Sequence, residues 1–199
     1  MEHLNARDMP CGFLRNTFKI QTREQSLELA NAFSPVAHAL LLCASQENKL
    51  RIAFTGKRNT GKTTFAAKIA QKIFPKSPKT TLLHDWSTLY GEEGENTLLH
   101  FDADAIKNRL SAIPDDNLPM RMRRQWQKHK DTYANARMHF VEWPEHDSQN
   151  THYNAIWDII APDPTIPQAR EYTFYCTDEI SQLPDYKTFL QNVSALVAT

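Results

Sequence analysis

Residues 51–70 read RIAFTGKRNTGKTTFAAKIA, which predicts a buried strand, a loop and a helix in succession. The loop, Gly56–Thr63, fits the pattern G-x-x-x-x-G-K-[ST] in full, and this pattern is typical of phosphate-binding loops. Glycine lets the backbone turn tightly and bring its N–H groups against phosphate oxygens. Lys62 would reach the β and γ phosphates, and the hydroxyl of Thr63 would ligate Mg²⁺. The stretch therefore predicts a nucleotide-binding loop.

The flanks of the loop agree with this prediction. Ile52–Phe54 is an apolar run before it, and apolar residues recur at helical spacing from Phe65 onward. A helix that begins at the loop presents unpaired N–H groups and a positive dipole end to an anion. The alternative, an ordinary Gly-Lys-Thr turn, is weaker because fewer than about one random chain in fifty of this length would match the pattern. The residues predicted to contact the nucleotide are Gly56, Asn59, Thr60, Gly61, Lys62, Thr63 and Thr64.

The composition is that of an ordinary globular protein. Of the 199 residues, 41% are hydrophobic and the formal net charge is zero, so no overall field attracts nucleic acid. The three cysteines, Cys11, Cys43 and Cys176, are too few and too widely spaced for a disulfide framework or a metal site. No apolar run approaches the length of a membrane span, and no signal-peptide core begins the sequence. We therefore expect a cytoplasmic protein without membrane contact.

The chain is long enough for one domain with a substantial core. We expect a P-loop domain at 23–180, between an irregular N-terminal extension at 1–22 and a C-terminal extension at 181–199. Within that domain, Ser26–Ala44 has the broad apolar face of a core helix, which Pro35 should kink or break.

Short apolar runs alternate with helical patterns beyond the loop helix. A polar connection punctuated by prolines comes first and has a turn at Gly91–Asn96. The alternation that follows indicates an α/β fold with a mainly parallel sheet flanked by helices. The expected strands are Thr97–Phe101, Met138–Val141, Ile156–Ala161 and Tyr172–Cys176, and the expected helices are Ala103–Ala112 and Pro119–Asn135.

Two acidic residues, Asp102 and Glu142, each follow an apolar strand. Ligands of open parallel sheets bind at the carboxyl ends of strands, and a nucleotide hydrolase needs an acid near the loop hydroxyl for Mg²⁺. We therefore predict Thr63, Asp102 and Glu142 as metal ligands. The predicted catalytic residues are Glu142, Asp102 and Lys62. The alternative for each acid taken alone is a solvated strand end.

Three stretches together resemble the TsaE-type ATPases, the small P-loop subunit of bacterial tRNA threonylcarbamoyladenosine (t6A) synthesis. They are Gly56–Phe65, Tyr90–Asp102 and Phe140–Pro144, and the resemblance covers about Gln25–Thr177. It implies that Lys62 and Thr63 bind ATP phosphate and Mg²⁺, and that both acids serve the metal and the hydrolytic centre.

The resemblance also implies an ATPase that is slow alone and works inside a multi-protein assembly, where hydrolysis resets a partner enzyme. It implies a switch threonine after the loop helix, and Thr80, Thr81 and Thr88 all remain candidates. The connection 75–96 is long and polar, which suits a switch segment ordered by the γ-phosphate and released on hydrolysis.

A basic run, Arg121–Lys130, lies between the two acids. At helical spacing Met122, Trp126 and Tyr133 would line one side of it, and cations would cover the rest. The favoured interpretation is an exposed charged helix anchored by Trp126, because charge runs are usually solvated. The alternative is an RNA- or protein-binding face on which Trp126 stacks.

A second class of function remains open. Asp102–Leu110 also resembles the acidic strand end and helix of small P-loop kinases, which transfer the γ-phosphate to a hydroxyl of a small molecule or nucleic acid. A nucleotide-binding scaffold with little hydrolysis is a third possibility. The histidines lack the close spacing of zinc ligands, so His100 is expected to be structural, and Trp143 is expected to be a core aromatic.

Overall fold

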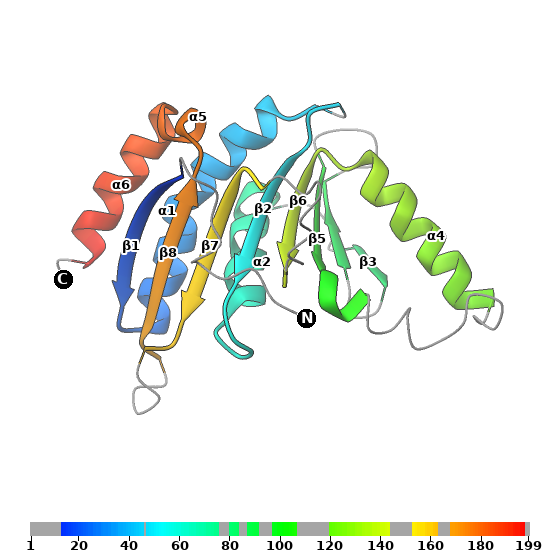
Figure 1. Ribbon diagram of the computed structural model, residues 1–199, viewed down its shortest axis with the longest axis horizontal. Helices are drawn as coiled ribbons and strands as arrows, with labels where there is room; N and C mark the ends of the chain where they lie inside the picture. The colour runs from blue at the N-terminus through cyan, green and yellow to red at the C-terminus, as the bar shows by residue number, and fades with distance from the viewer. Residues whose placement is uncertain are drawn as a thin grey trace.

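The computed structural model describes residues 13–45, 47–75, 80–83, 87–91, 97–106, 120–143, 153–162 and 168–197. Its strands are β1 (Leu14–Ile20), β2 (Leu50–Thr55), β3 (Thr80–Leu83), β4 (Ser87–Tyr90), β5 (Leu98–Asp102), β6 (Met138–Glu142), β7 (Ala155–Ile160) and β8 (Arg170–Cys176). They form one sheet in the order β1-β8-β7-β2-β6-β5-β4-β3 (Figure 1). The predicted α/β P-loop fold is confirmed.

The middle of this sheet is parallel and its margins are antiparallel. Strands β7, β2, β6 and β5 run parallel to one another, whereas β8 and β1 on one side and β4 and β3 on the other pair antiparallel. Parallel neighbours need long crossovers, while antiparallel ones can follow through a short turn. The sheet is thus of mixed type, and the P-loop follows β2 in its parallel part.

Three of the strands lie where no strand was expected. The segment 1–22 was predicted to be irregular, but residues 14–20 form β1, whose Phe18 and Ile20 point into the core. The polar connection 75–96 contains β3 and β4, which extend the sheet beyond β5. These strands are short or polar and lie at or near the sheet margins, where pairing with a neighbour replaces a strong sequence pattern. The turn predicted at Gly91–Asn96 lies outside the described residues except for Gly91.

Helix α1 (Arg23–Cys43) begins with a capping box, in which the Thr22 hydroxyl accepts from the Gln25 N–H and the Gln25 side chain accepts from the Thr22 N–H. The predicted break at Pro35 does not occur, since the helix continues through it. Pro35 is exposed, and the Ser34 hydroxyl donates to the Ala30 carbonyl 2.8 Å away. Because Pro35 has no N–H, the carbonyl of residue 31 lacks its usual helical donor. The Ser34 hydroxyl bonds to the carbonyl just before it.

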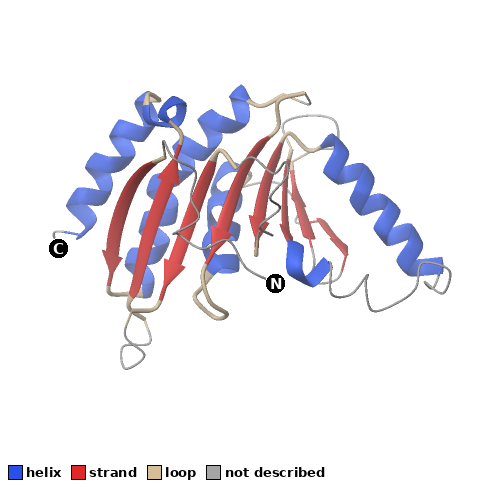
Figure 2. Ribbon diagram, viewed as in Figure 1, coloured by secondary structure: helices blue, strands red, loops and turns tan. Residues whose placement is uncertain are grey.

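One face of the sheet is covered by α1, α2 (Lys62–Ile73) and α6 (Pro184–Val197), and Figure 2 shows α1 and α2 behind the strands and α6 beside β1. A short helix, α5 (Asp178–Ser181), precedes α6. The core between these layers is aromatic, with the Phe33 ring centred 5.1 Å from Trp157 and 4.9 Å from Phe174. Helix α6 adds Phe189 to the same core. The segment 181–199, set apart as an extension on sequence, thus contributes to the main core.

By length and composition α1 is long and apolar enough to cross a membrane, the only such helix among the residues described. Its apolar residues Leu29, Phe33, Val36 and Leu41 are buried in the main core against the sheet and the neighbouring helices. The apolar side chains of α1 are therefore accounted for by their place in the core.

The other face of the sheet is covered at its β5 end by α4 (Met120–Asn135), which confirms the predicted helix at 119–135. Trp126 and Tyr133 of α4 pack on a smaller cluster that includes Leu99, Phe101 and Val141. Residues 103–106 form a helical turn after β5, and the rest of the helix predicted at 103–112 lies outside the described residues.

Candidate nucleotide site

The P-loop and both acidic residues meet at the carboxyl ends of three adjacent parallel strands. The loop follows β2, Glu142 ends β6 beside it, and Asp102 ends β5 one strand further. Glu142 lies opposite Phe54 on one side and opposite Asp102 on the other. The acid nearest the loop is therefore Glu142, although Asp102 comes first in the sequence.

The loop needs glycine at its two ends for different reasons. Gly56 has φ of 120°, and a Cβ there would lie 2.0 Å from the carbonyl oxygen of Ile159 on β7. Gly61 has φ of 94° and no neighbour near a Cβ position, so its requirement is conformational. Asn59 between them also has positive φ, at 62°. The loop thus presses against β7 and turns into α2 through a left-handed residue.

Lys62 is folded back onto its own loop. Its Nζ donates to the carbonyl of Gly56 at 3.0 Å and to that of Lys57 at 2.7 Å, and it lies 3.9 Å from the centre of the Trp143 ring. Burial lowers the pKa of Lys62, while the carboxylates of Glu142 and Asp102 act in the opposite direction. The ammonium is therefore held by neutral acceptors and a ring face, which can be exchanged for phosphate oxygens.

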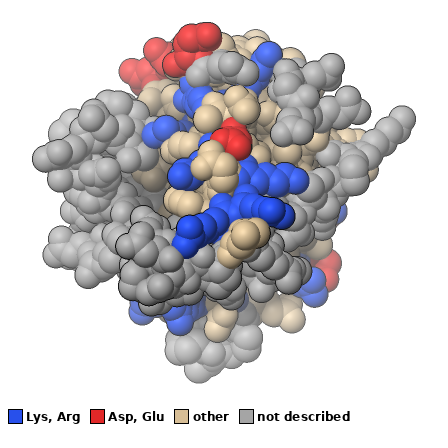
Figure 3. All heavy atoms as spheres, turned by 90° about the vertical axis from the view of Figure 1, so that its right-hand side faces the viewer, with Lys and Arg blue, Asp and Glu red and all other residues tan. Residues whose placement is uncertain are grey.

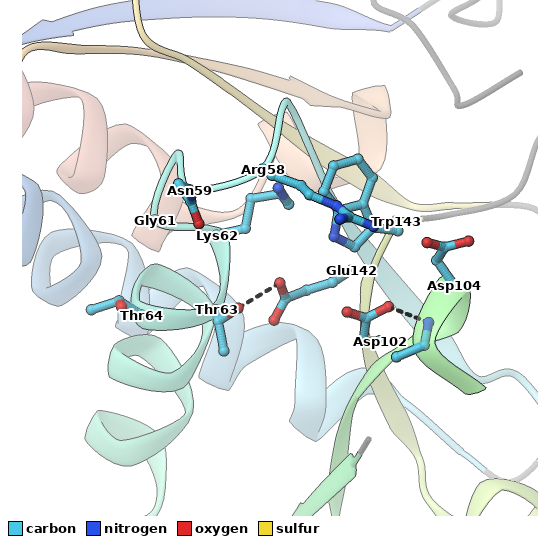
Figure 4. A pocket seen from close by; sticks show the side chains of 11 residues that line it. Arg58, Asn59, Gly61, Lys62, Thr63, Thr64, Asp102, Asp104, Glu142 and Trp143 are labelled. Atoms are coloured by element: carbon cyan, nitrogen blue, oxygen red, sulfur yellow. Dashed lines mark hydrogen bonds between the residues drawn. The ribbon is translucent and has the colours of Figure 1, made fainter. Parts of the chain in front are cut away.

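Glu142 connects the loop helix to β5. One carboxylate oxygen accepts from the Thr63 hydroxyl at 2.7 Å, and the other lies 2.7 Å from Nε2 of His100 (Figure 4 draws the bond to Thr63). Glu142 is only 3% exposed. A buried carboxylate needs such donors, and a proton on Nε2 of His100 supplies one of them. His100 was expected to be structural, but it holds the acid nearest the loop.

Asp102 points toward the same region from β5 and is less buried. Its carboxylate accepts from the N–H of Ala105 at 2.8 Å, at the start of the helical turn 103–106. Burial raises the pKa of Asp102, the bond from Ala105 lowers it, and the nearby Glu142 raises it further. A carboxyl such as Asp102, whose ionisation is disfavoured by burial and by a neighbouring carboxylate, suits a site that receives a cation.

These residues line a pocket of about 610 Å³, within the usual range for small-molecule sites. Trp143 lines the pocket above Lys62, with φ of 51°, and so is not the core aromatic that was expected. The lining residues are Arg58, Asn59, Gly61, Lys62, Thr63, Thr64, Asp102, Asp104, Ala105, Glu142 and Trp143. Gly56 and Thr60 belong to the loop without lining this pocket.

The donor set fits Mg²⁺ held together with phosphate. Thr63 and Glu142 offer a hydroxyl and a carboxylate in direct contact, and Mg²⁺ prefers such oxygens and keeps several waters. Nowhere in the described part of the chain do three His, Cys, Asp or Glu side chains cluster as a metal site. The free cysteines described, Cys43 and Cys176, lie on α1 and β8. The residues present therefore fit a magnesium ion shared with a nucleotide.

Residues 20–166 match the family model described as "Threonylcarbamoyl adenosine biosynthesis protein TsaE". The match includes the P-loop, His100 and both acids and covers well over half of the chain. The chain belongs to this family. Its members take part in t6A biosynthesis, a tRNA-processing function, with other proteins, and are associated with use of ATP. No curated protein matches the chain in sequence.

Family membership confirms the resemblance drawn from the P-loop, Tyr90–Asp102 and Phe140–Pro144, although Pro144 itself lies outside the described residues. Sequence reasoning missed His100 as the partner of Glu142 and gave no role to Arg170, which contacts the loop from β8. A signal for His100 was available, since it stands two residues before Asp102 and so shares its face of the strand.

Proposed function

We propose that this TsaE-family chain binds and hydrolyses ATP in a Mg²⁺-dependent reaction and acts with a protein partner in t6A synthesis, in the cytoplasm. The observation that carries the proposal is the contact of Thr63 with Glu142 at the mouth of a P-loop. It supports a hydroxyl and a carboxylate on the same ion. Bound Mg²⁺ would neutralise charge on the substrate's phosphate oxygens.

The chain's own residues divide the work. Lys62 exchanges the carbonyls of Gly56 and Lys57 for phosphate oxygens, because a charged acceptor is the stronger partner. Glu142 is held by Thr63 and His100, so its carboxylate keeps one orientation. Asp102, the less buried acid, is left to orient the attacking water or an outer ligand of the ion.

The exposure of the pocket supports the proposal of a protein partner. Arg58, Asn59, Thr63 and Thr64 line the pocket and are exposed, so this side of the pocket admits bulk water. Hydrolases of this class reach full rate when a segment or partner closes the site and adds a cation. We therefore propose slow turnover by the chain alone, with the switch segment 75–96 and its threonine, Thr80, Thr81 or Thr88, responding to the γ-phosphate.

RNA contact through Arg121–Lys130 belongs to the same proposal as a secondary feature. Arg123, Arg124, Lys128 and Lys130 are exposed on α4, and Figure 3 shows Lys and Arg gathering on this side of the molecule. Trp126 is half-buried and stacks on His129, so one face of its ring is already occupied. Support for RNA contact is therefore limited to attraction between these cations and phosphates.

The test is nucleotide titration and ATP turnover on three variants. Lys62→Ala should weaken Mg-ATP binding by about a hundredfold or more, because it removes the charge aimed at the phosphates. Glu142→Gln should keep binding and lower kcat by about a hundredfold, and Asp102→Asn should lower it in the same direction. Lys72→Ala, an exposed lysine at the end of α2, is the matched control.

Equal ATP affinity in wild type and Lys62→Ala would overturn the P-loop assignment. Full turnover by both acid variants would place the metal centre elsewhere. Assays with hydroxyl acceptors run in parallel, since phosphoryl transfer to an acceptor in preference to water would establish the kinase alternative.

A further inference from the structure

Arg170, the first residue of β8, lies against the outer side of the P-loop. Its Nε donates to the carbonyl of Thr60 at 3.1 Å, and Nη2 lies 3.5 Å from the carbonyl of Asn59. Nη1 donates to the carbonyl of Ala169 at 2.7 Å, which fixes the guanidinium to its own strand. Arg170 lies beyond residues 20–166, so the family match assigns it nothing.

The two carbonyls that Arg170 contacts belong to peptides whose N–H groups are donors of the loop. A peptide unit is planar and trans, so its C=O and N–H point in opposite directions. Holding the carbonyls of Asn59 and Thr60 toward β8 therefore turns the N–H groups of Thr60 and Gly61 the other way, toward the phosphate side. Asn59 and Gly61 line the pocket on that side.

The loop has reason to need this support. Asn59 has φ of 62°, a left-handed conformation that asparagine adopts more readily than most non-glycine residues, although it is less favourable than the right-handed one. The Thr60 side chain is turned back to the Lys57 carbonyl at 2.9 Å and is buried. Without the guanidinium, the peptides at 59–61 would keep this internal bond but lose their tie to the sheet.

The other end of the loop is tied to β7, the neighbour of β8. The hydroxyl of Thr55 donates to Asp158 at 2.8 Å, and Gly56 packs on the carbonyl of Ile159. Strands β7 and β8 pair antiparallel, with Ile160 opposite Glu171. The pair thus contacts the loop at its start through β7 and at its tip through Arg170.

We propose that Arg170 is a positioning residue of the nucleotide site, which orients the amides of Thr60 and Gly61 for phosphate by bridging the two carbonyls behind them. This rests on the proposed ATP binding at the P-loop. The planar guanidinium is suited to the task because it presents two donors in a fixed geometry, whereas a lysine ammonium is a single point charge.

The experiment titrates tripolyphosphate and Mg-ADP into five proteins by calorimetry: wild type, Arg170→Ala, Arg170→Lys, Arg15→Ala and Lys62→Ala. Arg15 is exposed on β1 opposite Tyr175, at the far end of β8, so its loss changes the net charge equally without touching the loop. Arg170→Ala should bind tripolyphosphate about ten- to a hundredfold more weakly. Arg170→Lys should remain weaker by about fivefold or more, and Arg15→Ala should match wild type.

Thermal unfolding without ligand shows whether each variant is folded, and the conservative Arg170→Lys decides the question if Arg170→Ala is not. Wild-type affinity in Arg170→Lys would overturn the orientation role in favour of simple charge attraction, and wild-type affinity in Arg170→Ala would overturn any role. Absence of binding by wild type, or unchanged binding by Lys62→Ala, would instead refute the proposed function on which this inference rests.

Discussion

The core under α1, α2 and α6 and the cluster under α4 bury different chemistry. The first is built of aromatic and aliphatic side chains, with Phe65 of α2 packed 5.1 Å from Trp157. The second contains two buried histidines, His129 and His139, stacked with Trp126 and Tyr133. The P-loop leads into the first region, so its placement depends on the packing of these apolar side chains.

The α4 cluster depends on its histidines staying neutral. Burial lowers the pKa of His129 to about 4 and that of His139 to about 3, and Arg51 and Lys49 add to the effect on His139. The Lys49 ammonium also donates to the carbonyls of Tyr133 and Ala134 at the end of α4. A protonated ring there would be buried beside other cations, so the α4 region should be the first to unfold as the pH falls.

The largest expected effect is a loss of stability when a buried aromatic side chain is truncated, and it should differ between the two regions. Trp157→Ala should lower the free energy of unfolding by about 3–5 kcal/mol, because Trp157 is fully buried among rings from α1, α2 and α6. Tyr133→Ala should cost less, about 1–2 kcal/mol, since that side chain is half-buried. Urea denaturation at pH 7.5 measures both. An equal loss in the two variants would contradict the ranking of the regions.

The second prediction concerns acid. The unfolded chain binds protons at His129 and His139 below about pH 6.5, while the folded chain keeps both neutral until about pH 4. Stability is therefore lost as the pH falls from about 6.5 toward 4, and each histidine contributes to that loss. The double variant His129→Gln, His139→Gln should flatten this dependence.

Hydrogen exchange at pH 5 and pH 7.5 locates the change, with His38→Gln on the exposed side of α1 as the control. Exchange should rise in α4 and β6 before it rises in α1. Equal loss of protection in both regions would contradict a separate acid-sensitive cluster.

The smallest effect concerns the surface of α4. Neutralising Arg123, Arg124, Lys128 and Lys130 to Gln should leave ATP turnover unchanged, because none of them lines the pocket. If α4 meets RNA, the four changes should also reduce the slope of log affinity against log salt by up to about three. The measurement is tRNA binding by fluorescence anisotropy between low and moderate salt. An unchanged slope would leave α4 as the solvated helix that the sequence favoured.

Sequence patterns predicted the structure best where the local structure requires particular residue types at particular positions. The P-loop requires glycine at two backbone positions and a lysine at a third, so Gly56, Gly61 and Lys62 could be placed by spacing. Helix α4 was foreseen because its aromatic residues recur at helical spacing beneath a charged surface. Strands β1, β3 and β4 were not foreseen, since marginal strands take much of their stability from a neighbour that the sequence does not name.

The roles of the site residues remain predictions, but the tertiary structure shows which residues lie next to them. The sequence alone predicted a nucleotide-binding loop, placed two acids at the ends of strands, and indicated the family to which the chain is similar. Only the tertiary structure decided that Glu142 lies next to Thr63 while Asp102 lies one strand further, because strand order is not chain order. It also decided that His100 and Arg170 reach the site, since contacts across 42 and 110 residues follow from sheet pairing and leave no local pattern.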